Sequence, residues 1–96
     1  MRGVPGPHAR IKRSMSNIEK IKQMCKEVGG KYYRDYEEDV GMCIVGDRAI
    51  IAGDFYVRVE EIGQGVIYEG VGILQDYEPD GRIVVKDLEQ NEEIVI

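Results

Sequence analysis

Histidine and tryptophan are almost missing from this chain of 96 residues, which contains no tryptophan and a single histidine, His8. Because His8 lies in the N-terminal segment, the sequence excludes a histidine-based active site or zinc site from the rest of the chain. The two cysteines, Cys25 and Cys43, cannot complete a four-ligand zinc site alone and do not form a Cys-x-x-Cys redox pair. We therefore expect neither zinc nor thiol-redox chemistry.

Long hydrophobic runs are also missing. The longest contain four residues, such as 49–52, whereas a membrane-spanning helix needs about 20 apolar residues. The N-terminal segment has no apolar core of a secretory signal. We expect a soluble, cytoplasmic protein that has no membrane partner.

Basic residues are few outside the first fourteen positions. Residues 1–14 contain four Lys/Arg, no acid, two prolines and two glycines, which predicts a disordered basic arm. Three interpretations stay open: an upstream extension before Met15, a native flexible tail, or an arm that contacts an anionic surface. Residues 15–96 hold nine Lys/Arg against eighteen Asp/Glu, a net charge of 9 − 18 = −9. Because residues 15–96 are this acidic, we do not expect them to bind nucleic acid.

One helix is predicted just after the basic arm. Ser16 and Glu19 have the spacing of a capping box, and Gly29-Gly30 suits the left-handed turn that ends a helix. We therefore expect a helix that starts after Ser16 and ends near Val28, with Lys20 among the residues that face water. Its apolar stripe consists of Ile18, Ile21, Cys25 and Val28, with Met24 beside them.

The remainder of the chain has the alternation and turn residues of short strands. The segments with strand character are 31–36, 40–45, 48–52, 55–61, 66–75, 82–86 and, more weakly, 93–96. Glycines at 63, 65, 70 and 72 indicate bulges or bends in the longest of them. We predict a single α+β domain over residues 15–96, with one N-terminal helix packed on a curled antiparallel sheet of five to six short strands.

Cys25 and Cys43 both lie on apolar faces of their predicted elements. Their spacing is compatible with a disulfide that would join the helix to the sheet. Packing as small, free apolar residues in the core is the alternative, and a reducing cytoplasm would favour it. The sequence leaves both readings open.

Two short stretches resemble known families. Cys25-x3-Gly29-Gly30, an acidic hairpin tip and Gly41-x-Cys43 resemble a small domain of uncharacterised function in hemolysin-like proteins, over residues 21–48. The closing hairpin, with its Asp80-Gly81 turn, is similar to that of small SH3-like barrels. Neither resemblance carries a catalytic residue onto this chain.

Acidic turns are the candidates for a metal site. Carboxylates clustered in loops can supply the oxygen ligands that Ca²⁺ and Mg²⁺ prefer. The alternative is a solvated acidic turn that keeps a sheet edge from pairing with other chains. The candidate ligands are Asp35, Glu37, Glu38, Asp39, Asp47 and Asp54.

Exposed tyrosine beside arginine is typical of protein interfaces. Alternation along the tyrosine-rich strand separates Tyr33 from its neighbours, and Tyr56 lies two residues from Arg58, so we select these three as candidate interface residues. Core filling is the other explanation, because the chain has only one phenylalanine. We predict a small, non-catalytic interaction or assembly module without a cofactor, with a protein partner or a second copy. The alternative is a divalent-cation-binding protein.

Overall fold

One helix and seven strands make up the part of the chain that the computed structural model describes, residues 15–96. The predicted basic arm, residues 1–14, lies outside the described residues. The elements are α1 (Asn17–Val28), β1 (Lys31–Asp35), β2 (Val40–Val45), β3 (Arg48–Gly53), β4 (Tyr56–Glu61), β5 (Gly65–Tyr77), β6 (Ile83–Asp87) and β7 (Glu92–Val95). No helix among them is long and apolar enough to cross a membrane.

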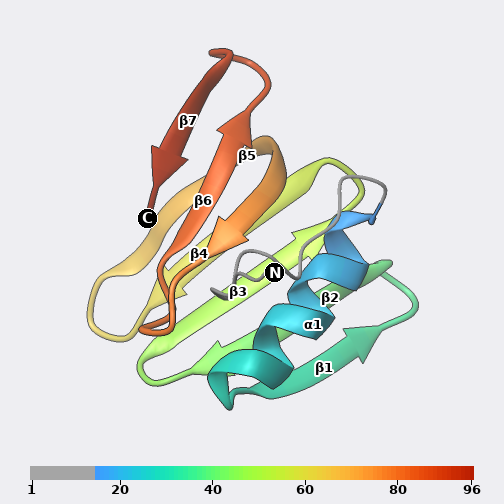
Figure 1. The fold of residues 1–96 in the computed structure, drawn as a ribbon, viewed down its shortest axis with the longest axis vertical. Helices are drawn as coiled ribbons and strands as arrows, with labels where there is room; N and C mark the ends of the chain where they lie inside the picture. Colours follow the sequence, from blue (N-terminus) through green and yellow to red (C-terminus); the bar gives the residue numbers. More distant parts are fainter. Residues whose placement is uncertain (1–14) are drawn as a thin grey trace, which may run out of the picture.

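The seven strands form a meander in which each strand pairs antiparallel with the next, in the order β1 to β7 (Figure 1). The prediction of an α+β fold with five to six strands is therefore wrong, because the described part has seven strands and is mostly sheet. The weak C-terminal pattern forms a full strand, since all four residues of β7 pair with β6. The long β5 serves two neighbours, β4 with its first half and β6 with its second.

The predicted boundaries of the helix are confirmed. The Ser16 hydroxyl accepts a hydrogen bond from the Glu19 amide at 3.2 Å, and the Ser16 amide donates to the Glu19 carboxylate at 2.8 Å. Gly29 ends the helix in the left-handed conformation, with φ of 74°. Lys20, which we expected to face water, is instead buried, and this burial lowers its pKa.

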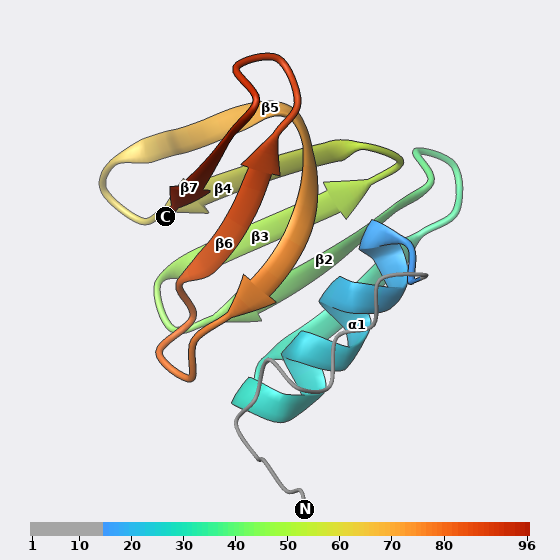
Figure 2. The ribbon, with the colours of Figure 1, turned by 45° about the horizontal axis from the view of Figure 1, so that its top comes forward.

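Glycines allow the sheet to curl along β5. A Cβ atom on Gly70 would lie 2.9 Å from the Tyr68 hydroxyl oxygen, and one on Gly72 would lie 2.7 Å from a methyl group of Val85. Register shifts between β4 and β5 and between β5 and β6 add to the bending. As a result, β6 and β7 fold back over the face of β2–β4 on which α1 also lies (Figure 2).

The hydrophobic core fills the space under these covers. We call the covered side of β1–β4 the inner face and the opposite side the outer face. The disulfide between Cys25 of α1 and Cys43 of β2 joins the helix to the inner face, with the two Cα atoms 5.5 Å apart. The fully buried residues are Ile21, Met24, Cys25, Cys43, Ile50, Ala52, Val57, Val59, Leu74, Tyr77, Ile83 and Val85.

Asn17, at the start of α1, is a buried polar residue whose hydrogen bonds bridge two strands. Its side-chain amide donates to the carbonyl oxygens of Gly53 and Gly72, both at 3.0 Å, and its oxygen accepts from the Leu74 amide at 2.9 Å. These bonds satisfy backbone groups of β3 and β5 that a bent sheet leaves unpaired. The helix is thus fixed at both ends, by Asn17 and by the disulfide.

Arg48 fixes the other end of the fold. Its guanidinium donates to the Glu61 carboxylate at 2.9 Å and to the carbonyl oxygen of Ile96 at 2.6 Å. The backbone of Ile96 in turn exchanges two hydrogen bonds with Ile83. This charged residue therefore connects β3 and β4 to the C-terminal hairpin.

Candidate interaction surface

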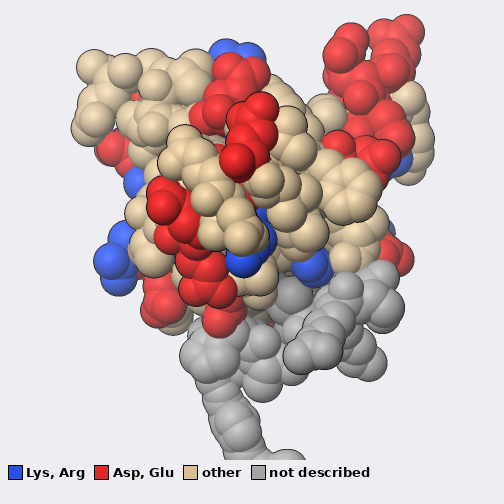
Figure 3. Space-filling model, turned by 90° about the horizontal axis from the view of Figure 1, so that it is seen from above, with Lys and Arg blue, Asp and Glu red and all other residues tan. Residues whose placement is uncertain are grey.

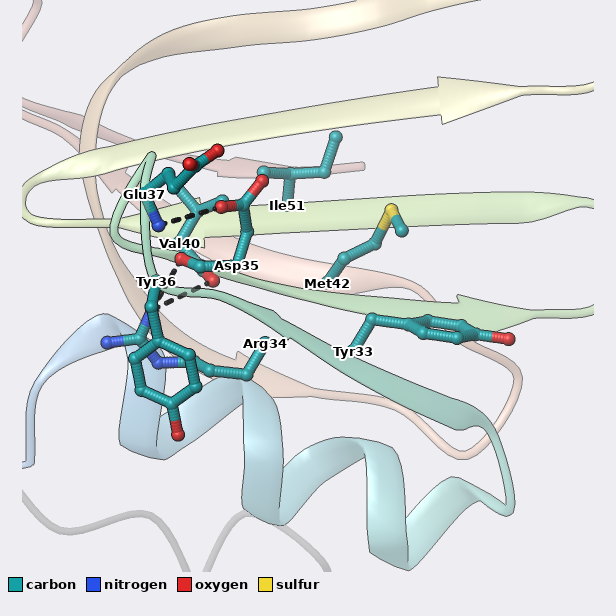
Figure 4. A pocket seen from close by; sticks show the side chains of 8 residues that line it. All are labelled: Tyr33, Arg34, Asp35, Tyr36, Glu37, Val40, Met42 and Ile51. Atoms are coloured by element: carbon teal, nitrogen blue, oxygen red, sulfur yellow. Dashed lines mark hydrogen bonds between the residues drawn. The ribbon is translucent and has the colours of Figure 1, made fainter.

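A row of side chains crosses the outer face from the edge strand inward. Tyr33 pairs with Met42, Met42 with Ile51, and Ile51 with Arg58, so alternation places all four on this face. The Tyr33 side chain is 50% exposed, and Met42 and Ile51 are half-buried. In Figure 4 the side chains of Tyr33, Met42 and Ile51 lie along neighbouring strands without an element above them.

An open depression of 530 Å³ lies at the β1–β2 end of this row. Its apolar floor is made by Val40, Met42 and Ile51 beside Tyr33, and we call these four residues the Tyr33 patch. Its rim is polar, from Asp35 and the following turn (Figure 4). An apolar centre with a polar rim is the ordinary anatomy of a protein–protein contact.

The other two predicted interface residues lie on the same outer face, further from the edge. The Tyr56 hydroxyl donates to the Glu69 carboxylate at 2.7 Å, and burial together with this bond raises the pKa of Tyr56. Arg58 forms an ion pair with Glu60 at 2.9 Å. The structure thus puts Tyr33, Tyr56 and Arg58 on one surface, with the polar pair bordering the Tyr33 patch.

The acidic turn between β1 and β2 is held by bonds that use its carboxylates. One oxygen of Asp35, Oδ1, accepts from the amides of Glu37 and Glu38 at 2.9 and 3.0 Å. Arg34 pairs with Asp39 at 2.8 Å and donates to the carbonyl oxygen of Asp35 at 2.7 Å. These carboxylates stabilise the turn and do not point together at a common centre.

The remaining predicted metal ligands are separated by the meander. Asp54 follows β3 at the same end of the sheet as the acidic turn, whereas Asp47 follows β2 at the other end. A strand of six residues spans about 20 Å, so Asp47 cannot share a cation with the others. Within residues 15–96, no group of three or more His, Cys, Asp or Glu side chains is arranged to hold a metal ion.

The sequence did not predict a hydrogen bond between the side chains of Tyr68 in β5 and Asp87 in β6. The Tyr68 hydroxyl donates to Asp87 at 2.8 Å, and burial together with this bond raises the pKa of Tyr68 to about 12. The other carboxylate oxygen of Asp87 accepts from the amides of Glu89 and Gln90, both at 3.0 Å. The Gln90 amide first, and then Tyr68, lower the pKa of Asp87. An aspartate directly before a turn is the available sequence signal.

No family model, curated protein or solved structure matches this chain. The resemblances to the hemolysin-like domain and to SH3-like barrels therefore stay predictions. Any functional inference rests on the geometry of the chain itself.

Proposed function

We propose that this protein is a non-catalytic assembly module that binds a second copy of itself through the outer-face side of β1. The observation that carries the proposal is the Tyr33 patch, an apolar area next to the outermost strand of the sheet. Large aromatic side chains that stay half exposed over an apolar floor are the usual anchors of protein contacts. The strand edge beside the patch offers backbone groups for pairing.

Several polar groups of the described region support an assembly role because they have structural partners. Asp35 and Asp87 stabilise turns, Asp39 and Glu61 pair with arginines, and Asn17 bridges strands. These contacts fix the shape of the sheet and leave the outer face as the surface on which a partner can lie. The carboxylates of the predicted cation site do not converge, so we do not propose cation binding.

Sedimentation of the wild-type chain over micromolar to millimolar concentration tests the proposal. We expect a reversible dimer whose dissociation constant rises at least tenfold in Tyr33→Ser. Phe55→Ser is the matched control, because Phe55 is an aromatic residue of similar exposure, 54% against 50% for Tyr33, and does not line the depression. A strict monomer at millimolar concentration, or equal effects of the two substitutions, would overturn the proposal.

A further inference from the structure

The two edges of the sheet differ in their chemistry. β1 reads Lys-Tyr-Tyr-Arg-Asp and carries both signs of charge, whereas β7 reads Glu-Glu-Ile-Val and carries acid only. Each is paired on one side, β1 with β2 and β7 with β6, and no described strand pairs with the other side. Edges of this kind are templates for strand addition.

The β1 sequence is complementary to itself when two copies run antiparallel about Tyr33. In that register Lys31 lies opposite Asp35 of the second copy, Tyr32 opposite Arg34, and Tyr33 opposite itself. A two-fold axis through the Tyr33 pair makes the Lys31–Asp35 contact twice. We infer that two copies join edge to edge through β1 in this register, which gives one continuous sheet. This inference rests on the proposed function and specifies its contact.

The side chains of Lys31 and Asp35 are accessible for this contact. Lys31 and Asp35 are both exposed and both project from the outer face, two residues to either side of Tyr33. The side chain of Lys31 has no hydrogen-bond or ion-pair partner among residues 15–96. The two amide hydrogen bonds to Asp35 both use Oδ1, so Oδ2 is available to accept from the lysine. Opposite charges directly across two strands stabilise the pairing.

Long-range charge favours the same edge. Two bodies of net charge −9 repel each other, and acidic side chains form larger patches than basic ones on the surface in Figure 3. β1 is locally positive, with Lys31 and Arg34 against Asp35, so pairing there adds less repulsion than pairing through β7. Pairing two β7 strands would place four glutamates in one short ribbon, which the same argument disfavours.

Head-to-tail pairing of β1 with β7 of another copy is the rival arrangement, because basic and acidic residues would meet there. That contact is not self-limiting, since it leaves a free edge on each copy and builds an open chain. The symmetric β1 pairing closes at two copies. The sizes of the assemblies therefore distinguish the two arrangements.

Single cysteine substitutions measure the register. Opposed residues in antiparallel strands have Cα atoms about 5 Å apart, within the range that a disulfide bridges. Tyr33→Cys is therefore expected to give a cross-linked dimer under mild oxidation, at a protein concentration above the raised dissociation constant measured for Tyr33→Ser. Lys31→Cys alone is expected not to cross-link, because the two Lys31 positions would lie about 14 Å apart along the strands. An equal mixture of Lys31→Cys and Asp35→Cys is expected to cross-link again. The existing pair Cys25–Cys43 is fully buried and bonded, so the wild-type chain is the blank.

Charge reversal provides a second readout that needs no cross-link. Lys31→Glu places four carboxylates around the two-fold axis and is expected to raise the dissociation constant of the dimer about tenfold. Lys22→Glu is the control, because it changes the net charge equally at an exposed position on α1.

The outcomes separate this inference from the proposed function. Cross-linking by Tyr33→Cys but not by Lys31→Cys supports the register. The register is overturned, and the assembly role left standing, if Tyr33→Cys sediments as a dimer yet fails to cross-link and the mixture of Lys31→Cys and Asp35→Cys also fails. Equal responses to Lys31→Glu and Lys22→Glu overturn it in the same way. A ladder of higher oligomers overturns the symmetric pairing in favour of the head-to-tail one. A strict monomer overturns both.

Discussion

The inner and outer faces of β1–β4 are built from alternating residues of the same strands, yet only one is covered by the described chain. Ile50 and Ile51 illustrate this, because they are consecutive in β3, and Ile50 is fully buried while Ile51 is half-buried in the Tyr33 patch. The inner face is covered because α1 precedes the sheet and β5 bends back over it. The fate of an apolar side chain in this fold is thus decided by where the rest of the chain passes.

The largest expected effect comes from truncating the two isoleucines separately. Ile50→Ala removes side-chain atoms from the closed core and is expected to lower the free energy of unfolding by about 3 to 4 kcal/mol. Ile51→Ala is expected to cost less than about 1 kcal/mol, because its site is open to water. Urea denaturation of both variants as monomers measures the difference. Similar losses for the two would mean that the outer face is covered after all.

Reducing the disulfide is expected to come next in size. Cys25 and Cys43 are separated by eighteen residues, and closing such a loop stabilises a protein by about 3 kcal/mol in the chain-entropy model. Thermal unfolding with and without reductant measures the loss. The double variant Cys25→Ala with Cys43→Ala should no longer respond to reductant. An unchanged midpoint for wild-type protein proven by mass to be reduced would contradict the prediction.

Asn17→Ala tests the contribution of the buried polar residue on the inner face. The substitution leaves the Leu74 amide and the Gly53 and Gly72 carbonyl oxygens without their side-chain partner, and it should cost about 2 kcal/mol. Hydrogen exchange at the Leu74 amide should accelerate more than exchange in β2. Ser16→Ala, which removes only the neighbouring helix cap, should cost about 1 kcal/mol and leave exchange at Leu74 nearly unchanged relative to global stability.

Tyr68→Phe is expected to have the smallest effect, about 1 kcal/mol at neutral pH, from the lost hydrogen bond to Asp87. It also has a pH signature. Because folding raises the pKa of Tyr68 to about 12, the folded state holds this proton more tightly than the unfolded state. The resulting stability is full below pH 10 and is lost as pH rises through about 12. Denaturation at pH 9 and pH 11 should show a smaller decline for Tyr68→Phe than for wild type.

The features of the fold that the sequence could predict are those set by residues close together in the chain. Ser16, Glu19 and Gly29 define the helix through contacts within a few residues, and alternation located each strand closely. The predicted number of strands and the predicted fold class were wrong, and residues 93–96 show why. A short strand is stable only when paired, and here the pairing partner is β6. Lys20 was misplaced for a similar reason, since burial depends on tertiary packing.

The candidate site could be predicted only in part. Alternation alone suffices to separate Tyr33 from Tyr32, and the placement of Tyr33, Tyr56 and Arg58 on one face follows from strand register. The acidic residues looked like one cluster in sequence, but the meander sends successive turns to opposite ends of the sheet. The role of Asn17 depends on the backbone of Leu74, 57 residues away, and no local pattern contains that information.

The triple attachment of Asn17 has a consequence for the order in which the chain becomes native. Each hairpin between β1 and β4 can form by strand pairing that starts beside its own turn. The paired residues are close in sequence, and the formation of such hairpins is fast. Asn17 is synthesised early, but its last partner, Leu74, belongs to a strand made much later. The helix can therefore pack on the early strands before β5 has folded, but the Asn17 hydrogen bonds to β5 form only afterwards. This one side chain thus makes the final position of α1 depend on a strand distant in sequence, whereas the rest of the sheet forms between neighbouring strands.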